Sequence, residues 1–189
     1  MMAFIEDITK LRFLYKLKSV YRFSSQDDRK ESAAEHTWSS LVLADFFLSR
    51  MNESLNRQKV FDLLLYHDVA EIIADDTPLH PEMSRSGKED REWQAIEEIK
   101  SKLPKRDGRR VLALFSEFEA QKSREAMFAK AIDALDAEIH ELDYKADWKG
   151  WDEAFLRRHK QHLVRPFPEL NEAFEELLTW QKENGYFDQ

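Results

Sequence analysis

The chain has 189 residues, a formal net charge of −8 and no cysteine. A chain of this length can bury a substantial core in one domain. Because cysteine is absent, a disulfide framework and a thiolate nucleophile are excluded, and any metal ion must be held by nitrogen and oxygen. The acidic balance argues against binding long nucleic acid through its phosphates, although a small anionic substrate in a locally positive pocket is compatible with it.

Neither a membrane span nor a secretion signal is expected. The longest apolar runs, such as residues 41–48, are too short to cross a bilayer, and Asp45 interrupts this one. The N-terminus lacks the basic-then-apolar layout of a signal peptide. We therefore expect a cytoplasmic protein that does not bind membranes.

Helical patterns fill the chain. The four glycines, at positions 87, 108, 150 and 185, fall where these patterns stop or start, and no alternating strand pattern of useful length occurs. We expect an all-α fold, a compact bundle of seven or eight helices in a single domain over residues 1–189.

The first half of the chain predicts three helices in order. Apolar residues at helical spacing predict the first over residues 4–20, and the polar segment 21–30 is expected to be a loop. Ser32-x-x-Glu35 is a capping-box pattern, so the second helix should begin near Ser32 with His36 in its first turn.

The third helix is predicted over residues 57–74, ending before Pro78, because proline biases its predecessor away from helical geometry. On this helix Leu63, His67 and Glu71 would stack at i, i+4 spacing. Glu71 should therefore lie one turn beyond His67 on the same face.

Further helices are expected in the second half of the chain. Ser86-x-x-Glu89 is a second capping-box pattern, which predicts a helix through Leu103. The remaining helices are expected at residues 108–121, 123–146, 151–163 and 168–183.

Three of the apolar helices carry polar groups that are costly to bury. His67 and Asp68 lie side by side among leucines, His36 opens one helix and Asp133 lies in the middle of another. Each histidine alone has an ordinary alternative as a hydrogen-bonded core residue. A divalent cation shared by all four residues would offset their desolvation together, and we therefore expect a His2Asp2 metal site.

These residues resemble the HD-domain superfamily of metal-dependent phosphohydrolases, whose ligands follow the order His, His-Asp, Asp. More narrowly, they are similar to the 5′-deoxynucleotidase subfamily of YfbR-type and HD-domain-containing protein 2-type enzymes. The matching patterns are Arg29-x-Glu31-Ser-x-x-Glu35-His36, His67-Asp68-x-Ala-Glu71 with Asp76 and Pro78, and Lys130-x-x-Asp133. The resemblance covers roughly residues 5–145, and the helices of residues 151–184 would pack on this core.

The resemblance implies that His36, His67, Asp68 and Asp133 bind one divalent metal ion. Cobalt, manganese or copper is expected, with zinc, nickel, iron or magnesium as alternatives. It also implies a small-molecule nucleotide substrate, a deoxynucleoside 5′-monophosphate, and a homodimer.

Hydrolysis of a phosphomonoester needs a cation, an activated water and a group that assists the leaving alkoxide. Four protein ligands leave about two positions of an octahedral ion open for water and phosphate. Glu71 is expected to hold this water or act as its base, with a solvated helix-end carboxylate as the alternative. We expect Asp76 to contact the sugar hydroxyl rather than serve as an acid, and an N-cap or Asx-turn role is its structural alternative.

Two cationic residues are candidates for binding the phosphate. Arg22 matches an arginine of the family and has the fork geometry that phosphate requires, although a surface role is the alternative. Lys130 is the second candidate, and it could instead pair with a carboxylate. Phe23 stands where some relatives have tryptophan beside the sugar, which leaves selectivity for deoxyribose open. Asp136 and His140 are expected to support the ligands from behind or to be structural.

Other functions would use the same ligands. A phosphodiesterase or a nucleoside-triphosphate hydrolase is the alternative within the fold, but triphosphate binding needs more basic groups than Arg22 and Lys130. The alternative outside enzymes is a non-catalytic helical interaction module with a structural metal site. Structural sites are closed, whereas catalytic sites keep an open position.

Overall fold

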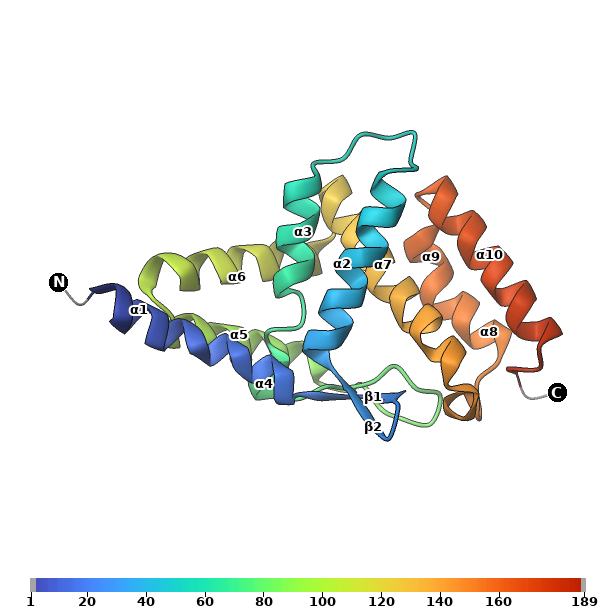
Figure 1. The fold of residues 1–189 in the computed structure, drawn as a ribbon, viewed down its shortest axis with the longest axis horizontal. Coiled ribbons are helices and arrows are strands. Elements are labelled where there is room, and N and C mark those ends of the chain that lie inside the picture. The colour runs from blue at the N-terminus through green and yellow to red at the C-terminus, as the bar shows by residue number, and fades with distance from the viewer. Residues whose placement is uncertain (1–2, 188–189) are drawn as a thin grey trace.

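The computed structural model describes residues 3–187, and its helices lie in three groups side by side (Figure 1). The central group consists of α2 (Ala33–Leu48), α3 (Arg57–Tyr66) and α7 (Arg124–His140). On one side lie α1 (Ala3–Leu11), α5 (Lys88–Lys102) and α6 (Lys105–Ala120), and on the other lie α8 (Glu153–Leu156), α9 (His162–Val164) and α10 (Pro168–Glu183).

The prediction of an all-α fold is confirmed. Within residues 3–187, seven helices have nine residues or more. An eighth helical segment joins α8, the π-helical turn η4 (Arg157–Gln161) and α9 without a break. Each helix of residues 3–187 is too short or too polar to span a lipid bilayer.

The prediction of a loop at residues 21–30 is wrong, because this segment forms two strands. Strands β1 (Tyr21–Gln26) and β2 (Arg29–Ser32) form an antiparallel hairpin, in which Gln26 pairs with Arg29 across the turn. Asp27 at this turn has φ +52°, a left-handed conformation that aspartate tolerates better than most residues. The strands are too polar for the alternation that identifies a half-buried strand.

The helix expected at residues 57–74 is interrupted. α3 ends at Tyr66, and the chain continues as a turn to the short helix α4 (Glu71–Ala74). In this turn the amide of Glu71 donates to the carbonyl of Asp68, three residues back, at 3.0 Å. The winding is tighter than an α-helix, so the expected i, i+4 stacking of His67 and Glu71 is also wrong.

Other boundaries differ from the prediction for local reasons. The first helix continues after α1 as the 3-10 helix η1 (Arg12–Ser19). The capping box at Ser86 is wrong, because α5 begins after Gly87 without a side-chain cap. The helix expected at residues 123–146 ends at His140 and is followed by the 3-10 turns η2 (Glu141–Asp143) and η3 (Lys145–Trp148).

Gly108 lies inside α6 rather than at a helix boundary, which corrects the expectation for this glycine. A Cβ atom at this position would lie 2.4 Å from the carbonyl oxygen of Lys100 on α5. The glycine therefore permits the close approach of α5 and α6.

The C-terminal helices share a core with the central group. Leu156, Phe167 and Phe174 are fully buried and belong to the same apolar cluster as Leu63 of α3 and Ile132 of α7. A second cluster packs α4 against α5 and α6. α7 belongs to the first cluster, and it carries side chains that line a cavity together with the hairpin, the segment from α4 to α5 and the C-terminal group.

Candidate metal centre

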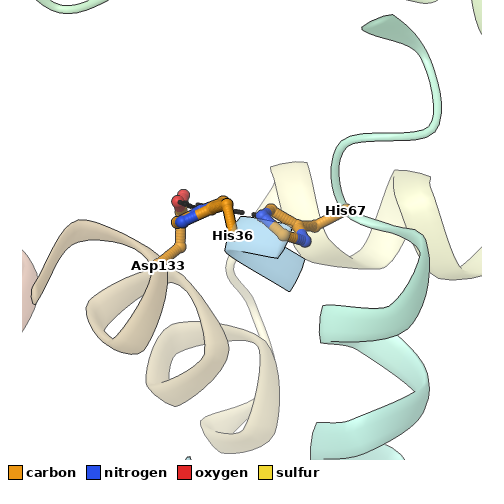
Figure 2. Close-up of side chains that lie close together, drawn as sticks. All are labelled: His36, His67 and Asp133. Carbon is orange, nitrogen blue, oxygen red and sulfur yellow. Dashed lines mark hydrogen bonds and ion pairs between the residues drawn. The ribbon is translucent and has the colours of Figure 1, made fainter. Parts of the chain in front are cut away.

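The four predicted ligands converge from three segments. His36 lies in the first turn of α2, where the capping box between Ser32 and Glu35 is present as predicted. His67 and Asp68 follow the end of α3, and Asp133 comes from α7. Figure 2 shows the side chains of His36, His67 and Asp133 pointing toward one another.

The donor atoms have the spacing that one ion requires. His36 Nε2 lies 3.1 Å from Asp133 Oδ1 and 3.9 Å from Asp68 Oδ2. His67 Nε2 lies 3.1 Å from Asp68 Oδ2 and 3.8 Å from Asp133 Oδ1. Ligands about 2.0–2.2 Å from a metal ion lie roughly 3–3.6 Å from their neighbours. The donor atoms of His36, His67 and Asp133 all lie within 4.8 Å of one another and fit a shared cation, whereas Asp68 lies outside this group and would have to shift to join it.

Hydrogen bonds from behind orient both imidazole rings. His67 Nδ1 lies 2.7 Å from the carbonyl oxygen of Leu64, which accepts its proton and leaves Nε2 as a free acceptor. His36 Nδ1 lies 2.9 Å from Asp136 Oδ2, which also accepts from the Ser39 hydroxyl at 2.7 Å. Such bonds are typical of metal-binding histidines.

Two donor atoms at this centre are buried and have no hydrogen-bond partner among residues 3–187, although they lie 3.1 Å from each other. They are His67 Nε2 and Asp68 Oδ2. Unsatisfied buried polar atoms are rare and energetically costly. A divalent cation would satisfy both, and the all-nitrogen-and-oxygen donor set fits such an ion.

Negative charge dominates the centre. Burial and Arg22 oppose protonation of His36, but hydrogen bonds to Asp133 and Asp136 raise its pKa to about 10. Burial, together with the charge of Asp68, raises the pKa of Glu71 well above its usual value. The excess of carboxylates is the environment that a divalent cation offsets.

A cavity of about 420 Å³ adjoins the centre. His67, Asp68 and Asp133 form part of its wall. The other predicted site residues also line it, namely Arg22, Phe23, Glu71, Asp76 and Lys130. The fold therefore brings the predicted ligands and the predicted substrate contacts to one place.

The hairpin carries Arg22 and Phe23 to the cavity. Arg22 Nη1 lies 3.6 Å from Asp68 Oδ2, while its Nε donates to Glu31 at 3.1 Å. Phe23 is half-buried, and its ring centroid lies 4.9 Å from that of His80. Arg22 is thus held in the cavity wall rather than at an exposed surface.

Contacts with the end of α7 and the turns after it fix the hairpin. Ser24 donates to Glu141 at 2.7 Å, and Ser25 donates to Asp147 through its amide at 2.7 Å. The ring of His140 bonds the Ser25 carbonyl at 2.8 Å. Of the two roles expected for His140, this contact matches the structural one.

Lys130 has the carboxylate partners that were its alternative. Its Nζ lies 3.4 Å from Glu119 Oε1 and 3.5 Å from Asp133 Oδ2, and 4.5 Å from the centroid of the Phe118 ring. These contacts hold the ammonium group in the cavity wall beside a candidate metal ligand.

Glu71 and Asp76 both line the cavity, and Asp75, which lies between them in the sequence, has a strained backbone. Glu71 is buried, and its Oε2 has no hydrogen-bond partner. Asp75 has φ +62° and ψ 159°, a region rarely adopted by residues other than glycine. Its carboxylate accepts from the amide of Asp76 at 3.1 Å.

Several cavity residues were missed by the sequence analysis. Arg85 and Lys88 come from the loop before α5 and its first residue, and His159 and Lys160 come from η4. The expectation that Arg22 and Lys130 are the basic groups near the site is therefore wrong. A cluster of basic residues at 157–160 was the available signal, but only folding brings it to the cavity.

Comparisons with known proteins agree with this geometry. The family model described as HD domain matches residues 14–172. The 5′-deoxynucleotidase HDDC2 of Bos taurus is 28% identical over 145 residues, which cover 77% of this chain and 68% of the relative. The protein of the same name from Homo sapiens is 27% identical over the same shares of the two chains.

A solved structure supports the assignment. A predicted metal-dependent phosphohydrolase from Magnetospirillum magnetotacticum MS-1 superposes with a TM-score of 0.88 at 26% identity, covering 98% of this chain and 96% of that one. Since the family model also spans most of the sequence, this chain belongs to the HD domain family.

Proposed function

We propose that this HD-domain hydrolase releases inorganic phosphate from deoxynucleoside 5′-monophosphates. The observation that carries the proposal is the convergence of four donor atoms beside a cavity lined by Arg22 and Lys130. Relatives that match 77% of the chain are named 5′-deoxynucleotidases, which supports this substrate class.

His36, His67, Asp68 and Asp133 would hold one divalent ion. When bound, the ion supplies positive charge against the phosphoryl oxygens and acidifies a water molecule. The donor set suits cobalt, manganese or copper, with zinc, nickel, iron or magnesium as alternatives.

The protein's own residues bind the substrate and move the protons. The Arg22 guanidinium and the Lys130 ammonium bind the phosphate oxygens. The Glu71 carboxylate accepts a proton from the attacking water, whose oxygen forms the new bond to phosphorus as the bond to O5′ breaks, and O5′ takes up a proton from solvent to leave as the 5′-hydroxyl. Asp76 hydrogen-bonds the sugar hydroxyl, and Phe23 packs against the sugar.

Longer substrates are the second candidate, because the structure offers more cationic groups than the sequence indicated. The side chain of Arg85 makes no hydrogen bond or ion pair within residues 3–187. It lines the cavity with Lys88 and Lys160, which are paired with Glu92 and Glu138. These groups could neutralise a triphosphate. A phosphodiesterase would use the same donor atoms, so both activities belong in the test.

The test is a phosphate-release screen with metal-depleted protein resupplied with one divalent ion at a time. Substrates are the deoxy- and ribonucleoside 5′-monophosphates, dATP and a phosphodiester. We expect metal-dependent release of phosphate from the deoxynucleoside monophosphates at the highest kcat/KM. Release of phosphate from dATP alone, or of the alcohol product from the diester alone, would overturn the proposal in favour of the corresponding alternative.

Three other expectations stay predictions. They are a single domain over the whole chain, a homodimer and a cytoplasmic location. Light scattering of the purified protein tests the homodimer directly.

A further inference from the structure

The cavity extends along α7 away from the candidate metal centre, and this extension is called the inner arm here. It is lined by Ser24 of β1, Ala134, Ala137 and Glu141 along α7 and the turn that follows, and Trp151 and His159 of the C-terminal segment. None of these residues has a role in the hydrolysis proposed above.

The inner arm lies about as far from the candidate metal centre as the base of a nucleotide lies from its phosphate. Ala134, Ala137 and Glu141 recur at i, i+3, i+7 and so share the α7 face that follows Asp133. Asp133 and Glu141 are eight positions apart, which is about 12 Å along a helix. This span is comparable with that from the phosphate of a nucleoside 5′-monophosphate to the far edge of its base.

The arm combines space with flat and polar surfaces. The small side chains of Ala134 and Ala137 leave room in its wall. Trp151 is 5% exposed, and its Nε1 has no hydrogen-bond partner in the part of the chain that the structure describes. Aromatic and apolar walls with a few convergent polar groups are typical of sites for flat organic ligands.

Glu141 is the polar group best placed to contact such a ligand. It is 6% exposed, and its Oε1 accepts from the Ser24 hydroxyl at 2.7 Å. Its Oε2 has no hydrogen bond to the residues that the structure describes, although Glu141 lines the cavity. A neighbouring carboxylate, Glu138, is already paired with Lys160. Glu141 thus has one oxygen fixed and one available.

The π-helical turn η4 places His159 and Lys160 at the arm. Such turns inside helices occur often at functional sites. Lys160 Nζ donates to the carbonyl oxygen of Ala134 at 3.0 Å as well as to Glu138. Lys160 of the turn therefore holds the face of α7 that lines the inner arm.

We propose that the inner arm is a nucleobase subsite in which Glu141 accepts a hydrogen bond from the exocyclic amino group of the base. This inference rests on the proposed nucleotide substrate. A carboxylate oxygen accepts from the amino group of cytosine but faces a carbonyl oxygen in uracil, where two acceptors repel. The subsite should therefore favour amino bases.

The matched substrates dCMP and dUMP test this directly. They differ in the group at position 4, amino against carbonyl, and in the adjacent N3, which is an acceptor in cytosine and an N–H donor in uracil. Burial, with the charge of Glu138, raises the pKa of Glu141 to about 7. Assays above this pH compare the substrates with an ionised carboxylate, which only accepts. We expect a kcat/KM for dCMP about tenfold above that for dUMP.

Glu141→Gln is the decisive variant, since the amide is isosteric and can donate or accept. The ratio of dCMP to dUMP should fall toward one. In Glu176→Gln, an exposed α10 residue, the ratio should stay at the parental value. A parental ratio near one, or a ratio unchanged by Glu141→Gln, would overturn the subsite.

Ala137→Leu gives a second reading by filling the arm. We expect kcat/KM for both nucleotides to fall about tenfold relative to 2-deoxyribose 5-phosphate, which has no base. Equal losses on all three substrates would contradict the subsite. If the parent hydrolyses 2-deoxyribose 5-phosphate but neither nucleotide, the proposed function itself fails, which distinguishes the two results.

Discussion

At one end of the cavity, the donor atoms of His36, His67 and Asp133 all lie within 4.8 Å of one another, whereas at the other end Ala134 and Ala137 leave space beside Glu141. The first end offers many donors around a point, as a small cation requires. The second offers few donors around a larger space, as a flat organic group requires. α7 contributes to both ends, so one helix sets the distance between them.

The two ends also differ in how they are supported. At the metal end, Asp136 and the Leu64 carbonyl orient the imidazole rings from behind. At the inner arm, a serine of the hairpin and the pair of Glu138 with Lys160 hold the wall. We therefore expect changes at the metal end to alter the reaction itself, and changes at the inner arm to alter which substrate is preferred.

The largest effect is expected from removal of a candidate ligand. His67→Ala or Asp68→Ala should abolish metal binding and activity together, because each leaves too few donors for the ion, while the helical content is kept. Elemental analysis, phosphate release and circular dichroism measure the three quantities. Stoichiometric metal in both purified variants would contradict the assignment of His67 and Asp68 as ligands.

Glu71→Ala should separate metal binding from catalysis. We expect the metal to be retained and kcat to fall by roughly 10²–10⁴-fold, the loss associated with a general base. The measurement is turnover of dAMP beside the metal content of the same preparation. Turnover at the parental rate would show that the buried Glu71 carboxylate takes no part in the reaction.

Asp136→Asn should lower the affinity for the metal ion without removing a ligand. The amide no longer supplies a charge behind His36, so metal affinity should fall by about 10–100-fold. Competition with a chelating dye gives the dissociation constant. Asp143→Asn, at an exposed position beyond α7, is the matched control, and an equal change in both variants would argue against support through His36.

The smallest effect is expected at Phe23, between the two ends. A contact of one group in an apolar pocket changes kcat/KM by roughly 10–200-fold, and phenylalanine fills less space beside the sugar than tryptophan. We expect dAMP to be preferred over AMP toward the lower end of that span, and less so in Phe23→Ala. Equal kcat/KM for dAMP and AMP in the parent would contradict a deoxynucleotidase. An unchanged ratio of dAMP to AMP in Phe23→Ala would show that Phe23 does not set the preference for deoxyribose.

Local sequence determined the features that depend on near neighbours. The capping box of Ser32 and Glu35 forms because a hydroxyl and a carboxylate three residues apart satisfy each other's backbone amides. It fixes the start of α2 and thus the place of His36. The donor types at the metal end were also predictable, because His67 and Asp68 are adjacent in an apolar segment and costly to bury unpaired.

Tertiary structure decided the features whose partners are distant in sequence. Ser86 and Glu89 repeat the spacing of Ser32 and Glu35, yet they form no capping box, because α5 begins after Gly87. The polar hairpin is fixed by bonds such as that from Ser24 to Glu141, 117 residues away. The inner arm likewise joins segments from β1, α7 and η4. The periodicity of apolar residues in the sequence predicts only which face a segment buries. It does not predict which other segment packs against that face, because this is fixed only when the helices pack together.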